Sequence, residues 1–239
     1  ENERPGGGIL ADAAAFVFGA GRLPVKPTPA SSLAGQMHQH RAGRIGHRLV
    51  FPDGRVSFAP MMPGSGPRPR LLPDRAFPPY AYLPGRFPHP LRHPEGHSYG
   101  AEPHATVRVD AALESEEFRW GVDLVKFGDY WEAHEAWEGL WQASREAPEQ
   151  RTFLHALILL SAAGVKLREG KGVPALRHAR RAARLLRALQ HQRDFEAAIG
   201  MPPEGLADRA EADALAGAFL HASISPVPSA AFAFTIVPD

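Results

Sequence analysis

The chain has 239 residues, 44% of them hydrophobic, and its 27 Lys and Arg residues nearly balance 26 Asp and Glu residues, for a formal net charge of +1. This composition is ordinary for a soluble globular protein and gives no overall field that would attract nucleic acid or anionic lipid. Because there is no Cys, disulfides, a thiolate nucleophile and a cysteine-based zinc site are excluded. The longest apolar stretch near the start, Ile9 to Ala20, is shorter than the roughly 20 residues that cross a bilayer. It also lacks the basic flank of a signal peptide, so we expect a cytoplasmic protein with no membrane partner.

Proline divides the chain into two unlike parts. Of the 24 prolines, 17 precede Asp110 and seven follow it, a density that excludes long helices and central strands from most of the first part. Residues 1–48 have no hydrophobic period, and we expect them to be disordered. Residues 49–108 are expected to form a Pro-rich arm. In its first segment, Leu49 to Phe58, the turn sequence Pro-Asp-Gly separates two apolar runs and predicts one short hairpin.

Residues 77–100 of the arm differ from the rest because aromatic side chains alternate with the prolines. Aromatic residues at this density usually have a surface to pack on. The segment therefore predicts an extended arm that lies over the helical domain, through Phe77, Tyr80, Tyr82, Phe87 and Tyr99.

After Asp110 the hydrophobic period is helical, and it predicts an all-α bundle of four to five helices, with the bundle proper over residues 109–195. Asp129 is the expected N-cap of the second helix, after an interruption at Gly128. The third helix is apolar almost all the way round, which is typical of a helix in the middle of a bundle. Residues 196–239 are expected to form a weaker helix and an apolar tail, which either makes a strand or packs down. The expected helices span residues 111–126, 130–143, 149–168, 173–190 and 205–221.

The second predicted helix contains three of the four tryptophans, in the run FGDYWEAHEAWEGLW. At 100° per residue, His134, Glu138 and Trp141 share the aromatic face, whereas Glu132 points away and Glu135 lies at the edge. A His and a carboxylate one turn apart among indole rings would be partly desolvated, so they must be hydrogen-bonded, charge-coupled or metal-bound. We therefore predict His134 and Glu138 as catalytic acid–base residues, one of them acting as the general base.

Polar residues at Arg151, His155 and Lys166 follow one stripe of the otherwise apolar third helix. If this stripe faces the second helix, it joins His134 and Glu138 in one polar cleft of a kind that shifts pKa values. Arg151 or Lys166 would then hold an anionic ligand or stabilise developing negative charge. The spacing also allows these two long side chains to reach solvent at the helix ends instead.

The run FGDYWEAHEAWEGLW, followed by RTFLHALILLSAAGVKLREGKGVPALRHARRAARLL, resembles the uncharacterised family called domain of unknown function 309 (DUF309). Its members have a similar aromatic, HE-x-x-E and Trp signature before a Gly/Ala-rich apolar helix. The resemblance covers about residues 117–190, and the upstream arm resembles an extension found in one branch of the family. It implies a small helical bundle and no established activity, and the chain departs from the family pattern at His155 and Lys171. The motif positions that it implies are His134, Glu135, Glu138, Trp141 and Arg151.

Three functions stay open at this level. His134 and Glu138 could bind a metal completed by His155 or by a histidine of the arm, but the run HEAWE lacks the second His of the HExxH zinc helix. No metal ligand is therefore assigned, and any cofactor is unknown. A small anionic ligand with hydrolytic chemistry is the second function, with Glu135, Trp141, Arg151, His155 and Lys166 as its binding residues. The third is a non-catalytic interaction module in which the same residues only stabilise the fold, and a homodimer is left open.

An arginine stripe lies on one side of the fourth predicted helix. Such a stripe is the ordinary outer surface of an amphipathic helix, and no aromatic or Gly-rich reader of nucleic acid accompanies it. Nucleic acid is therefore not an expected partner of this stripe, which consists of Arg177, Arg180, Arg181, Arg184 and Arg187.

Overall fold

The computed structural model describes residues 48–50, 56–58, 69–101, 109–218 and 227–238, in two compact units that divide between Pro67 and Arg68. In the first unit, strands β1 (Arg48–Val50) and β2 (Val56–Phe58) pair antiparallel, with Arg48 opposite Phe58. They lie where the turn sequence predicts a hairpin. Of residues 1–48, which are expected to be disordered, only Arg48 is among the described residues, and it belongs to β1.

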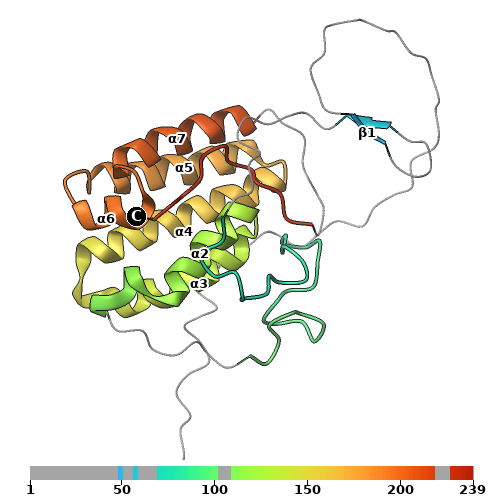
Figure 1. The fold of residues 1–239 in the computed structure, drawn as a ribbon, viewed down its shortest axis with the longest axis horizontal. Coiled ribbons are helices and arrows are strands. Elements are labelled where there is room, and N and C mark those ends of the chain that lie inside the picture. The colour runs from blue at the N-terminus through green and yellow to red at the C-terminus, as the bar shows by residue number, and fades with distance from the viewer. Residues whose placement is uncertain (1–47, 51–55, 59–68, 102–108, 219–226, 239) are drawn as a thin grey trace, which may run out of the picture. The chain divides into compact units, whose positions relative to one another are not determined.

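The second unit is all-α, as predicted (Figure 1). A 3-10 helix, η1 (Val109–Glu114), leads into α2, and successive long helices then pack side by side from α2 through α3 and α4 to α5, with α7 against α5. The described residues contain six α-helices, so the predicted number of four to five is wrong. The extra helix is α6, whose two turns are too short to show a hydrophobic period in the sequence. The bounds are α2 Glu116–Phe127, α3 Tyr130–Ala143, η2 Ser144–Glu146, α4 Pro148–Arg168, α5 Gly172–Arg187, α6 Arg193–Ile199 and α7 Pro203–Gly217.

Local signals set the ends of α2 and the start of α3. Oγ of Ser115 accepts a hydrogen bond from the Phe118 N–H at 3.1 Å, which caps the start of α2. Gly128 ends α2 with a φ of 97°, a conformation that favours glycine. Asp129 occupies the predicted N-cap position of α3, but its carboxylate makes no capping hydrogen bond and is fully buried.

Helix α4 is the central helix, as its apolar sequence predicts, and it packs against α3 on one side and α5 on the other. Nearly every residue from Phe153 to Arg168 is buried. Gly164 lies directly against the Tyr130 ring of α3, so a larger residue there would push the two helices apart.

The described part of the arm, residues 69–101, packs against α2 and α3, as expected. The N–H groups of Leu71 and Leu72 donate to the Asp123 carboxylate at 2.9 Å, and the Phe77 ring stacks on Trp120 with centroids 5.4 Å apart. Further along, the Tyr82 ring meets Trp131 edge-on at 5.1 Å. The arm is therefore held both by hydrogen bonds and by aromatic contacts.

The apolar tail packs down and forms no strand within its described residues, 227–238. Phe232, Phe234 and Ile236 are buried, and the Ala231 N–H donates to the Tyr130 hydroxyl at 2.7 Å. The tail thereby packs on Tyr130 at the start of α3.

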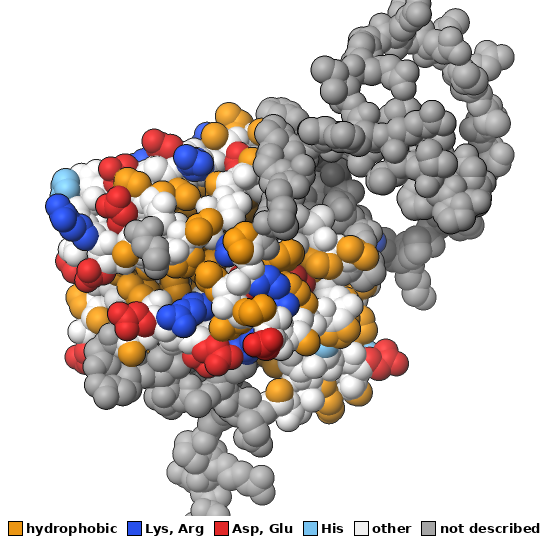
Figure 2. Space-filling view, viewed as in Figure 1, with side chains coloured by type: hydrophobic (Ala, Val, Ile, Leu, Met, Phe, Trp, Pro, Cys, Tyr) orange, Lys and Arg blue, Asp and Glu red, His pale blue; other side chains and the backbone are white. Residues whose placement is uncertain are grey.

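The outer surface of the second unit is mixed in charge. Figure 2 shows acidic and basic side chains interspersed with apolar ones over the face in view. Among the described residues, none of the helices has the length and apolar character needed to cross a membrane.

Candidate functional site

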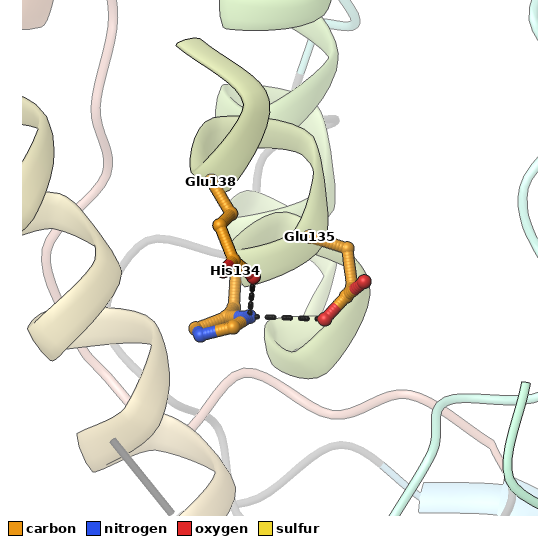
Figure 3. Close-up of side chains that lie close together, drawn as sticks. All are labelled: His134, Glu135 and Glu138. Atoms are coloured by element: carbon orange, nitrogen blue, oxygen red, sulfur yellow. Dashed lines mark ion pairs between the residues drawn. The ribbon is translucent and has the colours of Figure 1, made fainter. Parts of the chain in front are cut away.

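A cluster of one imidazole and two carboxylates lies on helix α3. Nδ1 of His134 is 3.3 Å from Oε1 of Glu135 and 3.9 Å from Oε2 of Glu138. Figure 3 shows Nδ1 facing both carboxylates, while the other ring nitrogen points away from them. The helical spacing places His134 and Glu138 one turn apart, and Glu135 joins them because its side chain bends back toward the imidazole. The three residues that the sequence singled out at HE-x-x-E are thus brought together.

The cluster extends from the protein interior to its surface. The His134 side chain is 1% exposed and that of Glu138 is 5% exposed, whereas the Glu135 side chain is 23% exposed. Burial raises the pKa of Glu138, His134 opposes this rise and Glu135 adds to it. Nε2 of Gln142 donates to Oε1 of Glu138 at 3.3 Å, which holds this carboxylate in place. A small solute could therefore reach the cluster from the side of Glu135.

The donor atoms of this cluster are close enough to share one ion. One ligand atom each from His134, Glu135 and Glu138 lies within 4.8 Å of the other two, and no other such group of three is present among the described residues. A set of one nitrogen and two carboxylate oxygens is suited to a divalent transition metal. The helix thus supplies a third donor, Glu135, in addition to the two that the sequence considered as possible ligands.

The indole rings of α3 have separate roles. Trp137 is fully buried, and its Nε1–H donates to the Phe118 carbonyl at 3.2 Å, so it belongs to the core between α2 and α3. Trp141 is only half-buried and lies one turn beyond Glu138. Of the two, Trp141 is the one that a ligand could contact.

Arg151 and His155 of α4 both lie against Trp141. The Arg151 guanidinium lies 4.1 Å above the indole centroid and donates to the Trp141 carbonyl at 2.9 Å, and the His155 ring is 5.7 Å from the indole. Burial lowers the pKa of His155, and the cations Arg181 and Arg151 lower it further. The predicted ligand residues Trp141, Arg151 and His155 are therefore brought together, about one turn of α3 beyond Glu138.

Lys166 forms an ion pair near the C-terminal end of α4. Its Nζ lies 2.8 Å from Oε2 of Glu169, and Nζ of Lys171 lies 2.7 Å from Oε1 of the same carboxylate. The charge of Lys166 is thus partly compensated by Glu169. That Lys166 and His134 line one cleft stays a prediction.

Glu132 is expected to point away from the face of α3 that His134 and Glu138 share, and the arm contacts it. Its Oε1 accepts a hydrogen bond from the Tyr82 N–H at 2.9 Å and lies 3.2 Å from Nε2 of His97, so the arm buries this carboxylate. The spacing along α3 gives the direction of the Glu132 side chain but not what lies there. The arm, which comes from outside the bundle, covers it.

A further buried carboxylate, Asp129, lies beside Glu132 without a hydrogen-bond partner for either oxygen among the described residues. Burial raises its pKa to about 7, Glu132 adds to this rise and Arg168 opposes it. Only a capping role was predicted for Asp129 from the sequence, because a position between a glycine and an aromatic helix carries no signal of burial.

His178 of α5 is also a polar residue that the sequence reasoning missed. Burial, followed by the cations Lys166, Arg181 and Arg177, lowers its pKa to about 4. A signal was available, because His178 follows the buried Ala175 by three residues and precedes the buried Ala182 by four. This spacing places His178 at the edge of the packed face of α5.

Comparison with known proteins agrees with the resemblance seen in the sequence. Residues 118–178 match the family model described as domain of unknown function (DUF309). The match begins in α2 and ends at His178, so it contains the His134, Glu135 and Glu138 cluster as well as Arg151 and His155. No curated protein and no solved structure matches the chain.

Proposed function

We propose that this DUF309-type helical domain binds a divalent metal ion through His134, Glu135 and Glu138 and uses it to hydrolyse a small-molecule substrate. The observation that supports the proposal is the approach of three donor atoms to within 4.8 Å of one another. These donors come from one regular helix, whose position is fixed by the buried Trp137 and by the packing of α4. The cluster is therefore preorganised, which lowers the cost of binding an ion.

The charges of the cluster favour a cation over an anion. Two carboxylates face the His134 ring, and an anion placed between them would be repelled by both. The cations that the sequence offered for anion binding lie elsewhere, Arg151 on Trp141 and Lys166 on Glu169. Of the two ligand classes that the sequence left open at this motif, a metal ion thus fits the cluster better.

Burial gives the site a further reason to take up a cation. The pKa of Glu138 is raised because its ionised form loses hydration, so this carboxylate is stabilised by either a proton or a metal ion. A divalent ion neutralises both carboxylates at once, which a single proton cannot do. Metal binding should therefore compete with protonation of Glu138.

The number of donors favours a reactive metal centre over a structural one. Structural zinc sites use four protein ligands, whereas catalytic sites keep a position for water beside three protein ligands. Zn²⁺, Mn²⁺ and Fe²⁺ accept a mixed set of imidazole and carboxylate, while Ca²⁺ prefers six to eight oxygens. A Zn²⁺ ion held by His134, Glu135 and Glu138 would make a bound water acidic enough to serve as the nucleophile of a hydrolysis.

The rival function is a non-catalytic module in which the same three residues form a hydrogen-bonded network that stabilises α3. A protonated His134 between two carboxylates would satisfy such a network without an ion. In such a module neither His134 nor Glu138 acts as a general base. The two functions differ in what happens when a metal is added.

Calorimetric titration of the full-length protein with Zn²⁺ and with Mn²⁺ tests the proposal. We expect one equivalent to bind, and we expect Glu135→Gln and Glu138→Gln each to weaken binding by more than about 100-fold, because each removes a ligand charge while keeping side-chain size. Glu196→Gln and His191→Asn, at exposed positions of α6 and the preceding loop, are matched controls that should bind as the unaltered protein does. Binding that is absent, or that is equal in all four variants, would refute the metal site.

The hydrolytic half of the proposal needs its own assay. Para-nitrophenyl phosphate and para-nitrophenyl acetate, each supplied with Zn²⁺ or Mn²⁺, report cleavage by the release of nitrophenolate. Turnover should rise with metal loading and should be lost in Glu138→Gln. A protein that binds one metal equivalent yet cleaves neither probe above the Glu138→Gln background would refute hydrolysis of such esters while keeping the metal site.

A further inference from the structure

Two buried carboxylates lie one turn apart at the start of α3. Asp129, the N-cap residue, is 0% exposed, and Glu132, three residues further on, is 6% exposed. Side chains three residues apart on a helix are neighbours on its surface. Both oxygens of Asp129 and Oε2 of Glu132 have no hydrogen-bond partner among the described residues. A buried carboxylate in this state is costly when it is charged, so the pair disfavours two negative charges.

Among the described residues, the hydrogen bonds from the arm to this pair all go to Glu132. The N–H of Tyr82 donates to Oε1 of Glu132 at 2.9 Å, and Nε2 of His97 lies 3.2 Å from the same oxygen. Docking of the arm therefore stabilises the charge of Glu132 through these two groups. It also removes water from around Glu132, so a charge on Asp129 is repelled more strongly when the arm is docked.

Arg168 of α4 is the cation that acts on Asp129, and its guanidinium also holds the backbone nearby. Nη1 donates to the Gly128 carbonyl at 3.3 Å and Nη2 to the Val227 carbonyl of the tail at 3.3 Å. Arg168 opposes the effect of burial on Asp129 without cancelling it. The tail adds no charged side chain within its described residues. The other titratable groups on the elements packed around this end of α3 are Tyr80, Tyr82 and His97 of the arm, Asp123 and Lys126 of α2, and Tyr130 and Glu132 of α3 itself.

We propose that Asp129 is a pH-sensitive switch for the arm, which stays docked on Glu132 while Asp129 is protonated and is released when Asp129 ionises. Release lets water reach Glu132, and water screens the repulsion between the two carboxylates. Burial raises the pKa of Asp129 to about 7, and Glu132 adds to the rise, so the switch operates near neutral pH. Because docking favours the protonated form, the stability of the docked arm is present at low pH and is lost as the pH rises through about 7. Asp129 is the one group whose titration the switch uses.

Release of the arm would uncover the face of α3 beside the proposed metal site. The rings of Tyr82 and His89 meet Trp131 edge-on, with centroids 5.1 Å and 5.3 Å away. Trp131 lies one turn before Glu135, and Glu135 is the member of the proposed metal site that is partly exposed. An effect on access to a metal rests on the proposed function, whereas the switch itself rests only on the arm and the carboxylate pair.

Hydrogen exchange in the full-length, metal-free protein measures arm release at single amides. The ratio of the Tyr82 exchange rate in the unaltered protein to that in Asp129→Asn cancels the intrinsic effect of pH on exchange. Asp129→Asn keeps the side-chain size but cannot ionise, and Asp129→Ser, a second uncharged N-cap, should give the same result. We expect the ratio to be at least about tenfold larger at about pH 8 than at about pH 5. Asp194→Asn, at an exposed position of α6, is the matched control and should leave Tyr82 exchange unchanged at both pH values.

Two results would overturn the switch. A ratio that is the same at both pH values would show that ionisation of Asp129 does not act on the arm. Equal exchange rates for Tyr82 and for buried amides of α4 such as Leu159, each corrected for its intrinsic rate, would also overturn it at the higher pH, because the arm would then open only when the whole bundle unfolds. Neither measurement contains a metal ion, so failure of the switch and failure of the metal site are told apart.

Discussion

The backbone N–H of Tyr82 donates a hydrogen bond to Oε1 of Glu132 at 2.9 Å, and Nε2 of His97 lies 3.2 Å from the same oxygen. A single carboxylate of α3 thus holds the arm at two points that are separated along the chain. His89 lies between Tyr82 and His97 in the chain, and its ring packs edge-on against Trp131 with the ring centroids 5.3 Å apart. Glu132 therefore couples arm docking to the helix that contains the proposed metal site.

Replacing Glu132 with Ala should loosen the arm. The substitution leaves the buried Tyr82 N–H without its acceptor, which costs about 1–3 kcal/mol. We expect limited proteolysis within residues 77–100 to become faster, and chemical denaturation to show lower stability by a similar amount. Glu196→Ala, at an exposed position, is the control, and equal cleavage rates in the two variants would contradict the latching role of Glu132.

Two glycines of neighbouring helices should respond to Ala in opposite directions. A Cβ at Gly121 would clash with the Trp137 ring, whereas a Cβ at Gly139 would meet open space. Gly121→Ala should therefore destabilise the fold by about 1–3 kcal/mol through overpacking. Gly139→Ala should stabilise it by about 0.5–1 kcal/mol, because Ala is the better helix former. Urea denaturation of both variants checks the pair, and a stabilising Gly121→Ala would show that α2 and α3 are not in contact there.

The buried Asp129 should make stability depend on pH. Its pKa is raised from the ordinary value of 3.8 to about 7 in the folded protein, because burial and the neighbouring Glu132 outweigh Arg168. A raised carboxyl pKa contributes stability that is fully present below the unfolded value and is lost as the pH rises toward and through about 7. The loss amounts to about 4 kcal/mol at most, from 1.36 kcal/mol per pKa unit.

Asp129→Asn removes this titration while keeping the side-chain size. We expect the unaltered protein to lose stability between about pH 5 and pH 8 relative to Asp129→Asn, because only the unaltered protein must ionise the buried carboxyl group of Asp129 in that range. Urea denaturation at the two pH values measures the difference for each protein. Parallel pH profiles would mean that Asp129 is solvated or paired in solution.

Metal binding should release protons. Because burial raises the pKa of Glu138, this group keeps its proton to a higher pH than an exposed glutamate does, and a bound ion would displace that proton. Zn²⁺ titrations in two buffers of different ionisation enthalpy measure the release directly. We expect it to increase as the pH falls toward the pKa of Glu138 and affinity to fall with it. Affinity that is independent of pH would argue against coordination by Glu138.

The bounds of α3 and the central position of α4 were predictable because they follow from local sequence signals. Gly128 and Pro148 bracket α3, so its bounds agree with the expected residues 130–143. The apolar run of α4 gave its central place in the bundle. The helix α6 was not predictable by the same route, since seven residues do not show a helical period.

Only the part of the site that is formed by residues close together in the sequence was predictable. His134 and Glu138 meet because they are one turn apart, which a helical wheel expresses, whereas the approach of Glu135 depends on the direction of its side chain. Arg151 lies on Trp141 because the carbonyl at the end of α3 accepts a hydrogen bond from it, a contact that the spacing in α4 cannot reveal. Glu132 and His178 depend on partners from the arm and from α4, so their environment arises only from the tertiary fold.

The central claim is that His134, Glu135 and Glu138 hold one metal ion, and anomalous diffraction from crystals grown with Zn²⁺ tests it most directly. The account predicts an anomalous peak about 2.0–2.2 Å from Nδ1 of His134 and from one oxygen of each carboxylate. A peak located elsewhere, or none in crystals whose three side chains keep the geometry described here, would contradict it.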